Sequence, residues 1–261
     1  MKTLYESLLD DDLIDKTDKM IKDEIKSFLK ENYIGSIKIS KELNADGKYE
    51  VSSSTNITVK NRDIISLTNG TFIWTVVRGT FGCESCYSLK SLEGAPKEVG
   101  KYFYCDNCYS LKSLEGAPEK VGGSFYCHNC ESLISLKSAP KEVGGNFYCS
   151  HCTSLESLEG APEKVEGSFD CVGCQSLKTL KGAPQMINGG FYCYGCKSLK
   201  TLEGAPKEVG GDFNCNNCDS LKSLEGAPKK VGGNFFCRVC KIQFTEDDVK
   251  KVSNVRGEIN C

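Results

Sequence analysis

The feature that most constrains this chain is a Cys-x-x-Cys pair that returns every 22 residues. The pairs lie at residues 83/86, 105/108, 127/130, 149/152, 171/174, 193/196, 215/218 and 237/240, which leaves Cys261 as the remaining one of 17 cysteines. A fixed period of this length is typical of a solenoid, in which each repeat is one coil that buries its apolar side by stacking on its neighbours. The spacing therefore predicts a repeat solenoid.

One repeat, residues 103–124, reads FYCDNCYSLKSLEGAPEKVGGS and predicts the path of a single coil. Phe103 and Cys105 are two residues apart, so they face the same side of a strand. Pro118 cannot donate to a strand ladder and breaks regular structure. The glycine pair at 122–123 permits a sharp turn into the next coil. We therefore expect a parallel sheet with one short strand per coil and irregular return segments.

A stacked array exposes apolar surface at its ends and needs a cap there. Residues 1–55 are predicted to form an α+β N-terminal cap, with a helix over 17–33 and a hairpin around the NADG sequence at 44–47. Residues 4–13 are predicted to be a second, weaker helix or a mobile arm. The cap is then followed by the array.

The solenoid itself is predicted to span residues 56–242, with a first coil that lacks cysteines. Residues 243–261 are predicted to be the C-terminal cap, a short helix from Phe244 to Val252 followed by a final strand. Thr245 is the expected helix N-cap, since acidic residues follow it in the first turn. Cys261 then occupies the cysteine position of a further strand, which explains the odd count.

The repeat resembles leucine-rich repeats, with Val99, Phe103, Cys105 and Cys108 in the positions of the leucine-rich consensus. A closer resemblance is to the bacterial BspA-like class of cysteine-containing repeats, although two more residues separate Phe from the second Cys here. The MKTLYESLL start, the SLKSLEGAP-KEVGG units and the FTEDDVKKVSNVRG ending are similar to short repeat proteins of gut bacteria and their phages. This resemblance implies a leucine-rich-like solenoid and implies no particular activity.

Charge and hydropathy narrow the class of partner. The net charge is −2, so the chain lacks the basic surface of a general nucleic-acid binder, and we expect no nucleic-acid partner. No apolar run is long enough to cross a membrane, and the aspartate-rich start is not a secretory signal. We therefore expect a cytoplasmic protein, of a bacterium or of a phage-infected cell, with reduced thiols.

The cysteines allow three interpretations. They are buried free thiols that act as small apolar residues, or zinc ligands, or disulfides between neighbouring coils. The spacing of successive pairs fits zinc sites, but a strict one-coil period shows no pairing of coils two by two. The zinc alternative would use Cys83, Cys86, Cys105, Cys108, Cys127, Cys130, Cys149 and Cys152 and the equivalent later pairs.

Catalytic motifs are missing from the sequence. It contains no phosphate-binding glycine loop, no G-x-S-x-G and no H-E-x-x-H, and only two histidines. A thioredoxin-like use of Cys-x-x-Cys requires a βαβ context that the repeats lack. We therefore expect a protein without enzymatic activity and without a cofactor.

The expected function is binding of a protein partner through the outward side of the strands. On a strand, residues that alternate with Phe and Cys point away from the core, and here they form a tyrosine-rich column, which suits recognition. A structural or accessory role in a phage particle is an alternative, and residues 163–196 depart most from the repeat. The predicted binding residues are Tyr102, Tyr104, Tyr126, His128, Tyr148, Asp170, Tyr192, Tyr194, Asn214 and Phe236.

Overall fold

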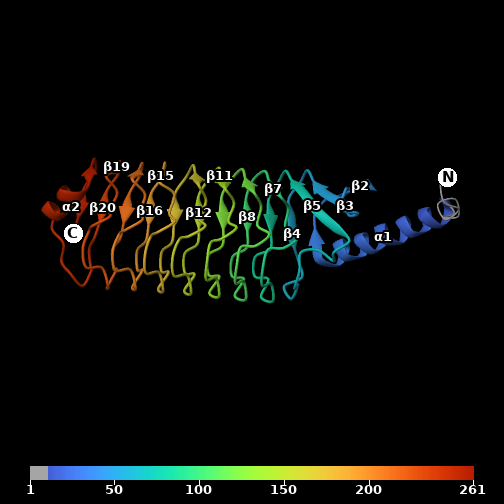
Figure 1. The fold of residues 1–261 in the computed structure, drawn as a ribbon, viewed down its shortest axis with the longest axis horizontal. Helices are drawn as coiled ribbons and strands as arrows, with labels where there is room; N and C mark the ends of the chain where they lie inside the picture. The colour runs from blue at the N-terminus through green and yellow to red at the C-terminus, as the bar shows by residue number, and fades with distance from the viewer. Residues whose placement is uncertain (1–10) are drawn as a thin grey trace, which may run out of the picture.

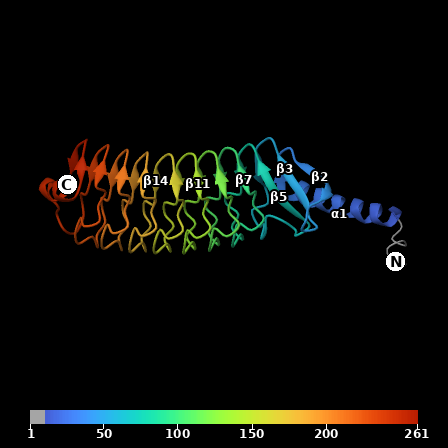
Figure 2. The ribbon, with the colours of Figure 1, turned by 45° about the horizontal axis from the view of Figure 1, so that its top comes forward.

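The structure, a computed structural model, describes residues 11–261 and is a β-solenoid of stacked coils with about 22 residues per turn (Figure 1). Two long parallel sheets run side by side along the stack (Figure 2). The sequence thus predicted the repeat solenoid correctly. Each regular coil, however, contributes two short strands, one to each sheet, instead of the single strand that we expected.

The first sheet, here called the Phe sheet, has a phenylalanine in each regular strand. Neighbouring coils pair in register, so that Phe125 lies between Phe103 and Phe147. Its strands, in spatial order, are β1 (Tyr33–Ile34), β4 (Ile57–Val59), β6 (Phe81–Gly82), β8 (Phe103–Tyr104), β10 (Phe125–Tyr126), β12 (Phe147–Tyr148), β14 (Phe169–Asp170), β16 (Phe191–Tyr192), β18 (Phe213–Asn214), β20 (Phe235–Phe236) and β22 (Ile259–Asn260).

The second sheet, here called the Val sheet, is built from the KEVGG part of each repeat, which we had expected to be an irregular return. Its inward residue is a buried valine, or Ile187 in one coil. Its strands are β2 (Lys38–Leu43), β3 (Tyr49–Ser53), β5 (Phe72–Val77), β7 (Glu98–Val99), β9 (Lys120–Val121), β11 (Glu142–Val143), β13 (Lys164–Val165), β15 (Met186–Ile187), β17 (Glu208–Val209), β19 (Lys230–Val231) and β21 (Asn254–Val255).

One core runs the length of the array. In the regular coils Phe, the first Cys, both Leu and the Val are buried, and most are fully inaccessible to solvent. From Phe81 to Phe235 the phenylalanine rings lie one above another, with centroids 5.0–5.8 Å apart. Each coil therefore completes the core of its neighbours, as expected for stacked repeats.

The turns of the coil need left-handed backbone at two places. Gly116, in the LEGAP sequence, has φ +83°, and Asn107, inside Cys-x-x-Cys, has φ +57°. Glycine and asparagine tolerate this conformation best. The glycine pair at 122–123 does not have positive φ, contrary to the reason that we gave for it. A Cβ at Gly122 would instead clash with the carbonyl oxygen of Gly100, so these glycines allow neighbouring coils to stack closely.

The N-terminal cap consists of a helix and a hairpin, as predicted. Helix α1 (Asp11–Asn32) includes the expected helical segment and extends away from the coils (Figure 1). The hairpin strands β2 and β3 are antiparallel, and β3 continues the Val sheet in parallel with β5. Of residues 4–13, the first seven lie outside the described residues, and the last three begin α1. No helix in the described part of the chain is long and apolar enough to cross a lipid bilayer.

Aromatic side chains join this cap to the first coil. Tyr33, the first residue of β1 directly after α1, meets Trp74 edge to face at 5.5 Å, and Phe28 of α1 lies 5.8 Å from Phe72. Ile25 and Leu29 of α1 are buried against the same cluster. The apolar surface of the first coil is therefore covered by the helix.

The C-terminal cap also follows the prediction. Helix α2 (Glu246–Val252) has Thr245 as its N-cap, in a capping box with Asp248. After it, β21 pairs with β19 and β22 pairs with β20, so the last coil has both strands. Cys261 follows β22 in the position that Cys237 holds one coil earlier, so the odd cysteine belongs to the ladder.

Candidate functional site

The outward side of the Phe sheet brings the predicted binding residues together on one face of the array. We call this surface the Tyr face: in each coil from Thr80 to Arg238 it comprises the residue before Phe, the residue between Phe and Cys, and the residue after Cys. The parallel register places the middle residues of neighbouring coils directly beside one another. All ten predicted residues lie on this surface.

Three tyrosines form a stack in the second to fourth coils of the Tyr face. Tyr126 lies between Tyr104 and Tyr148, with ring centroids 4.6 and 4.8 Å away and planes within about 20° of parallel. Tyr102 joins the stack at an angle, 6.4 Å from Tyr126, and is 43% exposed. The stack is half-buried, so its rings are held in place while their edges remain open to solvent.

Asp170 interrupts this column. It lies in register between Tyr148 and Tyr192, so that the tyrosine column continues only after one carboxylate. Its Oδ1 accepts a hydrogen bond from the backbone N–H of Val172 at 2.9 Å. Burial raises the pKa of Asp170 above its ordinary value. The Tyr face is therefore a three-tyrosine stack followed by a partly buried acid.

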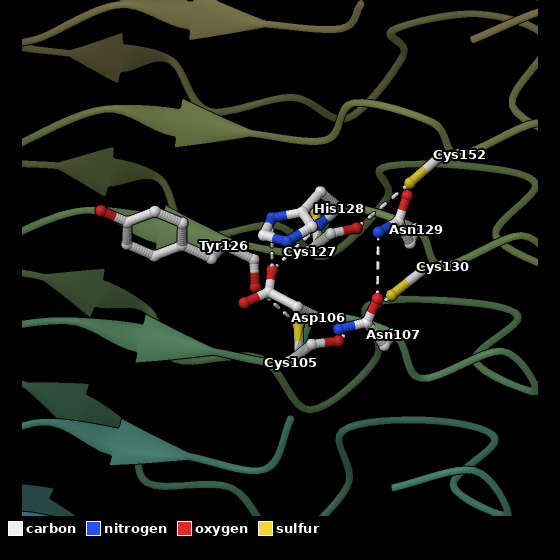
Figure 3. A network of polar contacts seen from close by, with 9 residues as sticks. All are labelled: Cys105, Asp106, Asn107, Tyr126, Cys127, His128, Asn129, Cys130 and Cys152. Carbon is white, nitrogen blue, oxygen red and sulfur yellow. Dashed lines mark hydrogen bonds and ion pairs between the residues drawn. The ribbon is translucent and has the colours of Figure 1, made fainter. Parts of the chain in front are cut away.

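A second acid, Asp106, lies beside Tyr104 and was not among the predicted site residues (Figure 3). Its Oδ1 lies 2.9 Å from Nδ1 of His128 and accepts the backbone N–H of His128 at 3.1 Å. Asp106 is only 6% exposed. Burial raises its pKa to about 7, helped by the carboxylate of Glu84, while burial lowers the pKa of His128.

A repeated hydrogen bond explains why short polar residues recur on this face. In the column before Phe, the side-chain oxygen of Ser124, Asn146, Ser168, Asp212 or Asn234 accepts the backbone N–H of the next coil's equivalent residue. Asp106 does the same in the column after Cys. The recurrence of Ser, Asn and Asp at these fixed positions is visible in the sequence and is the signal that could have indicated this bond.

Asparagine side chains add a further link beside the acid. Nδ2 of Asn129 donates to Oδ1 of Asn107 at 3.0 Å, and both residues have left-handed backbone (Figure 3). His151 has the same backbone conformation one coil later and is exposed. The position inside Cys-x-x-Cys is thus selected for its backbone conformation, which does not require a metal ligand there.

The cysteines lie behind this face, in the core. In every pair after the first, the second Cys donates its S–H to the backbone carbonyl of the first Cys one coil earlier, as Cys130 does to Cys105 at 3.2 Å (Figure 3). The same bond recurs from Cys108 to Cys240 at 3.1–3.5 Å. All 17 cysteines are free, and all but Cys240 and Cys261 are buried.

The zinc alternative would need these thiols as thiolates, the form that zinc binds. Burial raises the pKa of Cys105 and Cys127 well above the usual value. Within residues 11–261, moreover, no three His, Cys, Asp or Glu side chains gather as a metal site would require. The predicted zinc ligands lie in two columns along the core, and the second Cys of each later pair is a hydrogen-bond donor to the coil before it.

The residues within 163–196 that differ from the repeat sequence do not form one site. Glu166 and Asn188 lie next to the Val sheet, where Nδ2 of Asn188 donates to Oε2 of Glu166 at 2.7 Å. They line a hollow of about 520 Å³ with the exposed Met186. Asp170 and Tyr194 belong to the Tyr face, on the other sheet. The residues that differ from the repeat therefore lie on two different surfaces.

Comparison with family models, curated proteins and solved structures found no match to this chain. The resemblance to leucine-rich repeats thus stays a prediction, and the function is argued from the surface itself.

Asp106→Asn is expected to stabilise the protein above neutral pH. A carboxyl whose pKa rises from 3.8 to about 7 on folding binds more protons in the folded state, so its stabilising effect is lost as pH rises through 7. At pH 8 the variant should gain up to about 4 kcal/mol in free energy of unfolding, and at pH 4 almost nothing. Asn216 already accepts a backbone N–H in this column, so the amide fits.

Urea unfolding of both proteins between pH 4 and pH 9 measures this difference. Asp219→Asn, at an exposed position, is the matched control and should show no such pH-dependent gain. An equal gain for Asp106→Asn at pH 4 and pH 8 would contradict the assignment of the buried proton to Asp106.

Proposed function

We propose that the protein is a non-enzymatic scaffold that binds a protein partner through the Tyr face. The observation that carries the proposal is the ordered stack of Tyr104, Tyr126 and Tyr148, continued by the exposed Tyr102. The stack lies on a regular sheet several coils long. A partner therefore meets a flat, preformed row of phenol groups.

The energetics of such a row favour binding. Tyrosine offers a large apolar surface and a hydroxyl for hydrogen bonding, with few torsions to restrict. Ring stacking within the array already limits these torsions, as does the 2.7 Å hydrogen bond between Nδ2 of Asn146 and Oη of Tyr148. Little side-chain entropy is then lost when the partner binds, which favours affinity.

The proposal places the protein in the cytoplasm of a bacterium or of a phage-infected cell, and it requires no cofactor. The support is the chemistry of the thiols, which are free, buried and donate to carbonyl groups. Such thiols persist where the environment is reducing. The leucine-rich resemblance suggests the same kind of role, since solenoids present long binding surfaces.

Substituting Tyr104, Tyr126, Tyr148 and Tyr192 together by Ser is expected to abolish partner capture. Central aromatic residues commonly contribute 2 kcal/mol or more to an interface, so at least a thirtyfold loss of affinity is expected. Pull-down from the source cell with equal amounts of folded wild-type and variant protein, followed by quantitative mass spectrometry, measures it.

The matched control is Tyr87→Ser with Tyr109→Ser. These rings also stack, at 5.6 Å, and are 47% and 45% exposed, but they lie beyond the second Cys and outside the Tyr face. The control should capture the partner as the wild type does. Equal capture by the quadruple variant and the wild type would refute the proposal.

A further inference from the structure

We infer that the outward side of the Val sheet binds a second copy of this chain in a symmetric dimer. The inference goes beyond the proposed function, because it concerns a surface on the other sheet. We call this surface the Lys-Glu face: in each regular coil it comprises the two residues before the inward Val or Ile. These residues are 97–98, 119–120, 141–142, 163–164, 185–186, 207–208 and 229–230.

The Lys-Glu face carries both signs of charge in most coils. Five of the seven coils hold one lysine and one glutamate side by side, and all of these residues are exposed except the half-buried Glu208. The pairs are Lys97 with Glu98, Glu119 with Lys120, Lys141 with Glu142, Glu163 with Lys164, and Lys207 with Glu208. A strongly basic or strongly acidic partner would meet as much repulsion as attraction here. The surface fits a partner that presents the same pairs in reverse order.

A twofold axis provides that reversal. If the axis runs along the stack between the two columns of this face, each coil of one copy faces the same coil of the other with its two residues exchanged. Lys97 then faces Glu98 of the second copy, and Glu98 faces Lys97 of the second copy. The same holds in all five coils, whichever of the two residues comes first. Only the coil with Lys229 and Lys230 places like charges opposite each other.

The coil at 185–186 breaks the charge pattern with an apolar side chain. It carries Gln185 and Met186, and Met186 is the one apolar residue of the Lys-Glu face. Met186 is 65% exposed and lines the hollow of about 520 Å³ that lies between this coil and the coil before it. Pro162, Ala183 and Pro184 also line the hollow and are buried, so its floor is apolar.

The same twofold axis brings Met186 of each copy to the hollow of the other. The hollow extends from Met186 towards the preceding Ala-Pro steps at 161–162 and 183–184, and the exchange of columns moves the second copy's Met186 to that side. Methionine adapts to irregular gaps, and its burial removes apolar area from water. Exposed ion pairs add little affinity, so they set the orientation while Met186 contributes most of the binding. Because the face is narrow, the dimer is weak and reversible.

Sedimentation velocity of the full chain, at concentrations up to about 0.5 mM, tests this inference. Wild-type protein should show a reversible equilibrium between monomer and dimer. The variant Gln185→Lys with Met186→Lys should raise the dissociation constant of the dimer at least about tenfold, because it removes the apolar contact and places lysines opposite each other. Lys229 and Lys230 hold the same two positions in another coil, so the fold accepts this change.

The matched control is Ile134→Lys with Gln175→Lys. It also adds two lysines and replaces one glutamine and one exposed apolar residue, since Ile134 is 62% exposed. Lys112 and Lys197 hold the same positions one coil away, so the control has native precedents as well. Both positions lie outside the Val sheet, so the dissociation constant should change less than twofold. A wild-type protein that stays monomeric, or an equal loss in variant and control, would overturn the inference.

A charge exchange within one coil tests the symmetry of the dimer. Lys207→Glu places two glutamates opposite each other and should weaken the dimer about fivefold. Adding Glu208→Lys exchanges the pair and restores opposite charges, so the dissociation constant should return to within twofold of the wild type. Lys112→Glu changes the net charge as Lys207→Glu does, but outside the Val sheet, and should have no such effect. If the exchanged pair dimerised no better than Lys207→Glu alone, the symmetric dimer would be wrong.

Discussion

Phe147→Ala is expected to lower the free energy of unfolding by about 3–5 kcal/mol, because it opens a cavity in the middle of the core. Phe147 is completely buried, and its ring lies 5.3 Å from that of Phe125 and 5.1 Å from that of Phe169. Removing it takes away the contacts to both neighbouring coils at once. In a solenoid these contacts between neighbours couple the two halves of the array.

Urea unfolding followed by far-UV circular dichroism measures the effect as a lower midpoint. Loss of coupling at this coil should also broaden the transition or split it in two. Tyr148→Ala is the control, since Tyr148 is the next residue of the same strand and points outward. It should cost about 1 kcal/mol, the contribution of its stacking on Tyr126 at 4.8 Å. Equal effects of the two substitutions would mean that the strand is not oriented as described.

The cysteine period was sufficient to predict the solenoid, and local sequence signals predicted the helix and hairpin of the N-terminal cap and the helix of the C-terminal cap. A period of 22 residues requires every equivalent side chain to lie in the same place in its coil, so the burial of Phe103 and Cys105 follows from the repeat. The cap helix α2 was predictable for a local reason, because Thr245 and Asp248 form a capping box. A repeat period and a local capping sequence can both be read from a single sequence, without knowledge of which segments pack together.

The second sheet was not predictable from periodicity. A strand of two residues, such as Glu98–Val99, is too short to show the alternation that indicates a strand. Only the stacking of neighbouring coils makes it a sheet. The same limit applies to Asp106: the residue is visible in the sequence, but the burial that raises its pKa, with help from Glu84 one coil earlier, exists only in the stacked array.

The thiol ladder explains why cysteine recurs at the second position of each pair. Here the S–H of Cys130 donates to the carbonyl of Cys105, so the side chain joins two coils while it fills the core. Structure therefore accounts for the cysteines, and the surface beside them carries the proposed function.

Native protein is expected to react with iodoacetamide at no more than two of its 17 thiols within minutes at pH 8. Only Cys240 and Cys261 are partly accessible to solvent. Alkylation needs a thiolate, and burial raises the pKa of the inner thiols such as Cys149 and Cys171 well above the usual value. Both burial and protonation then protect them. Buried thiols react only through the unfolded fraction, which is less than about one in a thousand for a marginally stable fold, so their alkylation should be more than about a thousandfold slower in native than in unfolded protein.

Mass spectrometry counts the modified thiols before and after unfolding in guanidinium without reductant, where all 17 should react. Cys240→Ser with Cys261→Ser is the matched variant, and it should leave the native protein unlabelled. Fewer than 17 reactive thiols in guanidinium would reveal disulfides and contradict the free-thiol ladder. Protection that a chelator removes, together with about four zinc ions per chain by elemental analysis, would instead establish the zinc alternative, because tetrahedral thiolate sites would then join the coils two by two.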